Sequence, residues 1–189
     1  MKFLGATGVA ALVTVLTSLA VTLPGAVAPA AASSTMLQCS GLVGEMAAVP
    51  GVGAVQSPQK FTFPRTTASG CTGVPGISSA VRVSGSISTP AWDCDEATVD
   101  SPASGSLTVK WDDGTASKMS VTFTPNVSDP DALDVNGSVT KGTLQGALVS
   151  AIIANSAVVG DCVSKPIKRF AIVNDFEHWG TASYLTLTV

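Results

Sequence analysis

The sequence contains one histidine, His178, the residue type that most often serves as a general base near neutral pH. Asp175 and Glu177 lie close to it along the chain, and such a carboxylate could orient the imidazole. A Ser-His-Asp hydrolase would need this histidine, but the sequence lacks the Gly-x-Ser-x-Gly motif that presents the serine in many hydrolases. Polar loops between strands often carry such residues without a catalytic role, so we interpret His178 as a loop residue.

Two acidic stretches contain enough carboxylates to be considered as calcium sites, because Ca²⁺ prefers oxygen ligands. Neither has the spacing of a twelve-residue calcium loop, so we interpret both as solvated loop carboxylates and expect no metal site. A glycosidase needs two facing carboxylates, and the 13 acidic residues give no reason to select a pair. No phosphate-binding loop occurs, and we expect no cofactor. The stretches contain Asp93, Asp95 and Glu96, and Asp129, Asp131 and Asp134.

The three tryptophans suggest two different roles. Trp111 continues an alternating apolar pattern and is expected in the core, whereas Trp92 and Trp179 are expected in loops, where an indole can stack on a sugar or contact a protein. Each of these two loops also contains carboxylates. The candidate binding residues are therefore Trp92, Asp93, Asp95, Glu96, Asp175, Glu177, His178 and Trp179.

The four cysteines, Cys39, Cys71, Cys94 and Cys162, all follow the apolar N-terminal stretch. An even number in an exported chain indicates two disulfides. Zinc ligation would need closely spaced pairs, which are absent. Three pairings are possible, and we favour Cys39–Cys71 with Cys94–Cys162 because sequential loops give the simplest strand topology.

The first 32 residues have the three regions of a secretory signal peptide. Lys2 supplies the basic start, the apolar run covers Phe3–Val21, and the small residues Ala30–Ala32 suit a signal peptidase. We predict cleavage before Ser33, a single domain over residues 33–189, and a secreted or cell-envelope location. The alternative is an uncleaved membrane anchor, since the apolar run is close to the length that spans a bilayer.

Composition and charge constrain the partners. The chain has 10 basic and 13 acidic residues, a formal net charge of −3, and no cluster of basic residues beyond Lys165, Lys168 and Arg169. Nucleic acids and anionic membranes are bound by basic patches, so we expect neither as a partner. No segment after the N-terminal run is long and apolar enough to cross a bilayer, so we expect no membrane span after cleavage.

Alternating apolar and polar residues predict a β-hairpin over Gly105–Thr124. Period-two alternation places successive side chains on opposite faces of a strand. The intervening Asp112–Gly114 suits a three-residue loop that ends in a left-handed glycine. In that register Leu107 faces Met119, and Trp111 continues the same buried face.

Similar patterns predict seven further short strands, joined by turns rich in Gly and Pro. The chain should therefore be an all-β, single-domain sandwich or barrel of eight to nine mostly antiparallel strands with two disulfides. Residues Thr66–Gly76 and Thr89–Ser104 are expected as loops, and Gly85 on an apolar face suggests a bulge or a close backbone approach. The further strands are Leu37–Met46, Gln59–Phe63, Ser79–Ser88, Ala132–Thr140, Thr143–Ala154, Ile167–Val173 and Thr181–Val189.

A second hairpin is expected around Lys141 and Gly142. Its predicted register has Gly137 facing Gly146 and, further along, Val135 facing Leu148. The alternative is a buried helix over residues 144–159, whose apolar residues also suit that structure. We favour the strand because its glycine would match the glycine of the preceding strand.

Cysteines, glycines and a tryptophan recur in a pattern that spans most of the chain after residue 32. The pattern consists of Cys39, Gly41, Trp111-x-x-Gly114-x-x-Ser117, Gly137-x-Val139-x-x-Gly142-x-x-x-Gly146 and Cys162. With these residues the chain resembles small secreted proteins of unknown function from high-GC actinobacteria. It departs from them in its acidic stretch 93–96 and in residues 175–179. The resemblance implies export, a disulfide-pinned β fold and no assigned activity, and it carries over no catalytic residue.

Two function classes remain open. The first is a non-catalytic secreted or cell-envelope protein that binds a cell-wall glycan or an extracellular protein. The second is a small secreted hydrolase or hydrolase inhibitor. Strand surfaces covered in Ser and Thr, together with the lack of a recognisable nucleophile–base set, favour the first. An exposed patch of Trp92 and Trp179 would support it, whereas a cleft that places His178 beside a hydroxyl would support the second.

Overall fold

The computed structural model describes residues 36–94, 102–126, 128–129, 132–160, 162, 164–174 and 183–189, except for the side chains of 155–159. These residues form ten strands in one sheet and no helix, which confirms the all-β fold. None of the described segments is a helix of the length and apolarity needed to cross a membrane. The strands are β1 (Met36–Val52), β2 (Ser57–Thr62), β3 (Thr66–Thr72), β4 (Ala80–Trp92), β5 (Ala103–Trp111), β6 (Ala116–Pro125), β7 (Ala132–Gly142), β8 (Leu148–Val159), β9 (Ile167–Val173) and β10 (Tyr184–Thr188).

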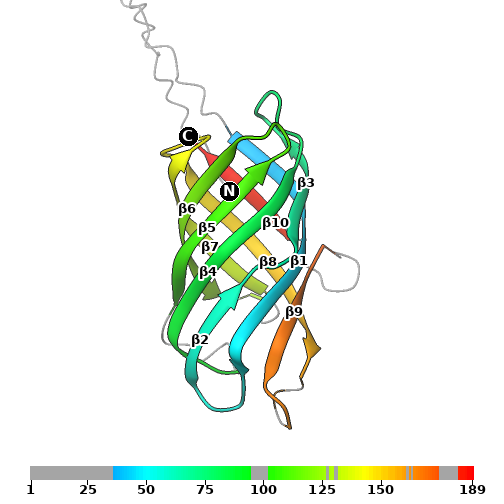
Figure 1. Ribbon diagram of the computed structural model, residues 1–189, viewed down its shortest axis with the longest axis vertical. Coiled ribbons are helices and arrows are strands. Elements are labelled where there is room, and N and C mark those ends of the chain that lie inside the picture. Colours follow the sequence, from blue (N-terminus) through cyan, green and yellow to red (C-terminus); the bar gives the residue numbers. More distant parts are fainter. Residues whose placement is uncertain are drawn as a thin grey trace, which may run out of the picture. The chain divides into compact units, whose positions relative to one another are not determined.

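The sheet closes on itself because β1 pairs along both of its edges. One edge pairs with β2 and β3, and the other pairs with β9 and β10. From β4 to β8 each strand pairs with the next in sequence, and β8 returns to β9 and β10. All of these pairs are antiparallel, so the chain forms an up-and-down barrel (Figure 1). The choice between sandwich and barrel is thereby decided.

Two positions in the barrel wall are each occupied by two short strands. β2 and β3 follow one another along the same edge of β1, and their register differs by one residue, since Ala47 pairs with Thr62 and Val43 with Thr67. β9 and β10 likewise follow one another between β1 and β8. The strand beyond the eight or nine predicted is β3, whose residues were expected as a loop.

Three segments outside the predicted strands are strands instead. Thr66–Thr72 forms β3, although Thr66–Gly76 was expected as a loop. β4 continues to Trp92, which pairs with Ser57 of β2, so the predicted connection from Thr89 begins too early. β1 also continues through Pro50 to Val52, where it pairs with β9. In each case a partner strand distant in sequence supplies the hydrogen bonds that extend the strand.

The hairpin predicted over Gly105–Thr124 is confirmed as β5 and β6. Leu107 pairs with Met119 as expected. Gly114 has φ +87° and its N–H donates a hydrogen bond to the carbonyl oxygen of Trp111 at 3.1 Å. The left-handed conformation at this position is the one that glycine adopts without steric cost.

The second hairpin is also present, and residues 148–159 form a strand rather than a helix. Its turn is longer than predicted and covers residues 143–146. The Val139 N–H donates to the carbonyl oxygen of Ala147 at 2.8 Å, and the Gly146 N–H donates to that of Val139 at 2.9 Å. This turn delays the start of β8 and therefore changes its register.

The register predicted for this hairpin is wrong. Gly137 pairs with Val149 rather than with Gly146, and Val135 does not face Leu148. The shift is three residues, and an odd shift moves every side chain of a strand to the opposite face. Leu148 is consequently 66% exposed, whereas Val149 is buried inside the barrel.

Gly85 permits a close approach between β4 and β5. It pairs with Leu107, whose side chain is buried, and has φ +132°. A Cβ atom at this position would lie 2.3 Å from the carbonyl oxygen of Ser106, which no real side chain tolerates. The close backbone approach expected from the sequence is thus confirmed, and it allows the strong curvature that a closed sheet requires.

Both favoured disulfides are present. Cys39–Cys71 joins β1 to β3, and Cys94–Cys162 joins the end of β4 to the segment that follows β8. Both lie in the part of the chain that the sequence assigns to the exported domain. The predicted signal peptide, residues 1–32, lies outside the described residues, and its cleavage stays a prediction.

Candidate functional site

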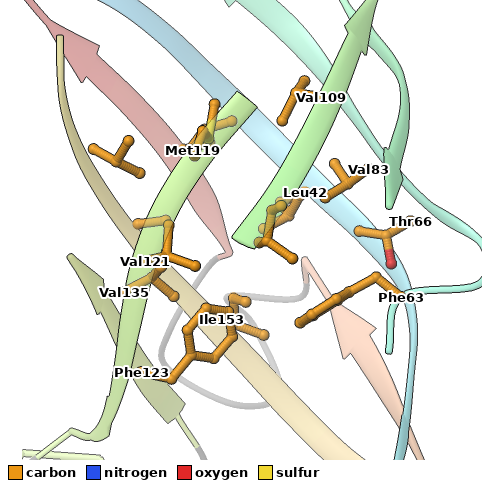
Figure 2. Close-up of a pocket in the computed structure, with 14 residues that line it drawn as sticks. Leu42, Phe63, Thr66, Val83, Val109, Met119, Val121, Phe123, Val135 and Ile153 are labelled. Atoms are coloured by element: carbon orange, nitrogen blue, oxygen red, sulfur yellow. The ribbon is translucent and has the colours of Figure 1, made fainter. Parts of the chain in front are cut away.

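The barrel interior is almost completely filled by side chains. A cavity among the described interior residues has a volume of about 30 Å³, close to the volume of one water molecule, whereas ligand pockets usually measure about 300–1,000 Å³. Figure 2 shows Phe63, Phe123 and Ile153 meeting within it, and the two phenyl centroids are 5.8 Å apart. The one polar lining residue, Thr66, donates its hydroxyl hydrogen to the carbonyl oxygen of Glu45. The interior is therefore a packed core.

Trp92 does not provide the exposed ring that the sequence suggested. It is 2% exposed and packs edge-on against Phe61, with ring centroids 5.4 Å apart. The neighbouring Asp93 is also buried, at 9% exposure. Because β4 continues to Trp92, its indole points into the core instead of belonging to a loop. The expectation that Trp92 lies exposed in a loop is therefore wrong.

The other six candidate binding residues lie outside the described residues, and their roles stay predictions. The described residues that precede these two loops lie beside different positions along β1. Cys94 donates its N–H to Gly53, next to the end of β1, whereas Ile172 pairs with Gly44 in the middle of β1. At about 3.3 Å per residue these positions are up to about 30 Å apart along the strand. The six residues are Asp95, Glu96, Asp175, Glu177, His178 and Trp179.

A buried serine, Ser183, is the first described residue after the second of these loops and is held by hydrogen bonds to neighbouring strands. Ser183 is 0% exposed, and its hydroxyl donates to the carbonyl oxygen of Val173 at 2.6 Å. The Ser183 hydroxyl oxygen in turn accepts a hydrogen bond from the Ala154 N–H at 2.9 Å. Ser183 thus joins β8, β9 and the start of β10 where the regular pairing of these strands is interrupted.

A groove of about 460 Å³ lies beside the second disulfide, between the β1–β2 turn and residues 162–166. Gln59 supports one wall from the interior, because its side-chain amide accepts a hydrogen bond from the Gly51 N–H at 3.1 Å and donates one to the Gly51 carbonyl oxygen at 2.9 Å. Lys165 is the charged residue among those that line the groove. Val55 in the same lining is 79% exposed.

A smaller pocket of about 280 Å³ lies on the outer wall and contains two arginines, Arg65 and Arg169. Ala47 of β1 forms part of its lining and pairs with Thr62 on one side and with Arg169 on the other. The Nε atom of Arg169 is 3.2 Å from a carboxylate oxygen of Glu45, so that charge is already balanced. Arg65 leaves room for one small anionic group such as a carboxylate. Sequence patterns did not indicate this pocket because its residues come from separate strands.

The outer wall of β4–β7 is covered by side chains that can form hydrogen bonds. Their cross-strand register arranges them in two rows, which we call the hydroxyl rows. Every member is at least partly exposed. The first row is Ser86–Ser106–Ser120–Ser138, and the second is Ser88–Ser104–Thr122–Asn136.

The β5–β6 turn is attached to the segment before β4 through Asp112. Its carboxylate accepts hydrogen bonds from the Ser78 hydroxyl, from the Ser78 N–H at 3.2 Å and from the Ser79 hydroxyl at 3.1 Å. The hydrogen bond from the Ser78 hydroxyl is the main cause that lowers the pKa of Asp112 from 3.8 to about 2. Asp113 instead accepts from Thr115 within the turn. Both carboxylates have structural partners.

The described residues contain no group of three or more His, Cys, Asp or Glu side chains arranged to hold a metal ion. No protein-family model matches the chain, and neither does any curated protein or solved structure. The outer wall and its pockets are therefore the places from which a function has to be inferred.

Proposed function

We propose that this chain is an exported protein of the cell envelope or its surroundings, and that it binds a partner through its outer surface without catalysing a reaction. One contrast carries the proposal. Among the described residues, the interior cavity has space for about one water molecule, whereas the wall presents two hydroxyl rows and two surface pockets. This contrast favours a ligand that contacts the outside of the barrel. Two disulfides support an oxidising, extracellular environment.

Export is tested by mass spectrometry of the culture supernatant. The expected product begins at or near Ser33 and contains both disulfides. Recovery of only the full-length chain, in the membrane fraction, would contradict export.

Binding is tested by co-sedimentation of the oxidised chain, residues 33–189, with isolated cell walls. We expect retention that falls several-fold in the variant Ser106→Ala/Ser120→Ala, which removes two hydroxyls from the first row. The matched control is Thr67→Ala/Thr72→Ala, which removes two exposed hydroxyls of β3 and should leave retention unchanged. Equal retention of all three proteins would exclude the hydroxyl rows as the contact surface.

The alternative function, a small hydrolase or hydrolase inhibitor, depends on His178, Asp175 and Glu177. Each can be replaced singly by Ala without changing the hydroxyl rows. We expect each variant to be retained by cell walls as well as the unaltered chain is. We also expect that none of the three substitutions reduces the turnover of any substrate. A loss of turnover of about a hundredfold or more with folding intact, the effect of removing a general acid or base, would overturn the non-catalytic proposal.

A further inference from the structure

Four basic side chains gather on the outer wall at one end of strands β4–β7. Arg82 pairs with Lys110 across β4 and β5, and Lys118 pairs with Lys141 across β6 and β7. The two pairs are diagonal neighbours, because Lys110 pairs with Ala116, two residues before Lys118. All four side chains are exposed. We call this group the basic belt, and the strands that carry it lie side by side in Figure 1.

No ion pair to a residue of the basic belt is found within the described part of the chain. Directly paired residues have Cβ atoms about 5 Å apart, and like charges on residues directly opposite one another destabilise a sheet. Within the described part of the chain, the ion pair found is Arg169 with Glu45, which lies outside the belt. Asp112 and Asp113 of the adjacent turn accept hydrogen bonds from serine and threonine and keep their negative charge, so they offset part of the belt's charge without an ion pair to it. Four of the chain's 10 basic residues are thus concentrated on one wall of a protein with net charge −3.

The fold itself does not require these charges. Lysine on a strand often protects an open sheet edge against pairing with another chain, but a closed barrel has no such edge. The repulsion between paired cations lowers stability unless an anion is bound. The geometry therefore points to a ligand with several negative charges that can extend across four strands, a width of about 14 Å.

The surroundings of the basic belt indicate the chemical class of that ligand. Ser84 and Thr108 pair beside it, and the first hydroxyl row lies next to them. These groups can bind sugar hydroxyls, while Arg and Lys bind carboxylate, sulfate or phosphate groups. The aromatic residues of these four strands, Trp92, Trp111 and Phe123, are all buried. Single-stranded nucleic acids usually stack on exposed aromatic rings, and membrane surfaces take up exposed apolar side chains.

We propose that the basic belt binds an acidic polysaccharide. This inference rests on the proposed binding function and names the class of its partner. Val81 is the one large apolar side chain exposed on the described parts of β4–β7, so a membrane is less suited to this wall than a hydroxylated polyanion.

The test measures binding of the oxidised chain, residues 33–189, to polygalacturonate by isothermal titration calorimetry, with neutral dextran as the uncharged control. The belt variant is Lys110→Gln/Lys118→Gln. The control variant, Lys60→Gln/Lys168→Gln, removes the same charge at exposed positions outside the belt and the pockets. We expect at least a tenfold loss of affinity in the belt variant and less than a twofold change in the control. Lys110→Arg/Lys118→Arg should retain binding.

Several outcomes would overturn this inference. Equal losses in both Gln variants would mean that overall charge, not the basic belt, determines binding. Tighter binding to phosphatidylglycerol vesicles or to single-stranded DNA than to polygalacturonate would assign the belt to a membrane or a nucleic acid. A further outcome is that the chain binds neither polygalacturonate nor a second acidic polysaccharide, dextran sulfate, and still sediments with cell walls. In that case the inference about the basic belt fails while the proposed function stands. Circular dichroism of each variant establishes that folding is intact.

Discussion

The indole of Trp111 donates its Nε1 hydrogen to the hydroxyl oxygen of Ser117 at 2.9 Å, and both residues are 0% exposed. The Ser117 hydroxyl in turn donates to the carbonyl oxygen of Thr143. This chain of two hydrogen bonds connects the central hairpin to the β7–β8 turn. It also satisfies the indole N–H, which would otherwise be buried without a partner.

Replacing this serine tests the connection. In Ser117→Ala the indole N–H and the Thr143 carbonyl both lose a partner, so we expect the free energy of unfolding to fall by about 1–3 kcal/mol. Urea denaturation followed by circular dichroism measures it. Ser120→Ala, at an exposed position of the same strand, should stay within about 0.5 kcal/mol of the wild type. Similar values for both variants would mean that the buried hydrogen bonds contribute little.

The register of β7 and β8 predicts opposite effects at two adjacent residues. Val149→Asp places a charge in the packed interior and should destabilise the protein by about 3 kcal/mol or more, or prevent folding. Leu148→Asp changes a side chain that is 66% exposed and should shift stability by less than about 0.5 kcal/mol. Thermal unfolding of both variants makes the comparison. A larger loss of stability in Leu148→Asp than in Val149→Asp would instead support the register predicted from the sequence.

The burial of Trp92 can be measured by fluorescence. The variant Trp179→Phe retains Trp92 and Trp111, which are 2% and 0% exposed. Acrylamide reaches only accessible rings, so we expect weak quenching and emission at short wavelength from the native variant. Unfolding in guanidinium should increase quenching and move the emission to longer wavelength. Native quenching as strong as that of the unfolded chain would contradict the burial of Trp92.

The pKa of Asp112 predicts a pH-dependent contribution to stability. Its pKa is lowered from 3.8 to about 2 in the folded protein, so the unfolded chain binds the proton more readily. The contribution is therefore fully present above pH 3.8 and is lost as the pH falls towards about 2. The difference in Tm between the wild type and Asp112→Asn should shrink across that window, in a series of thermal melts. For Ser120→Ala the difference should not change with pH. A constant difference for Asp112→Asn would contradict the lowered pKa.

Local sequence patterns predicted the features that depend on neighbouring residues. Alternation identified the buried face of the central hairpin, and Gly114 after two aspartates identified its loop. Both follow from chain geometry within about twenty residues, where side-chain direction and turn conformation leave few alternatives. The even number of cysteines after the predicted signal peptide likewise indicated two disulfides.

Tertiary structure decided what depends on strands that are distant in sequence. Pairing of β1 with β9 and β10 closes the barrel, and pairing of Ser57 with Trp92 extends β4 and buries an indole that was expected in a loop. The basic belt arises only because cross-strand register brings together Arg82, Lys110, Lys118 and Lys141, which no charge cluster in the sequence shows. Alternation within one strand determines which face a side chain takes, but its neighbours on that face depend on the register and bulges of the adjoining strands.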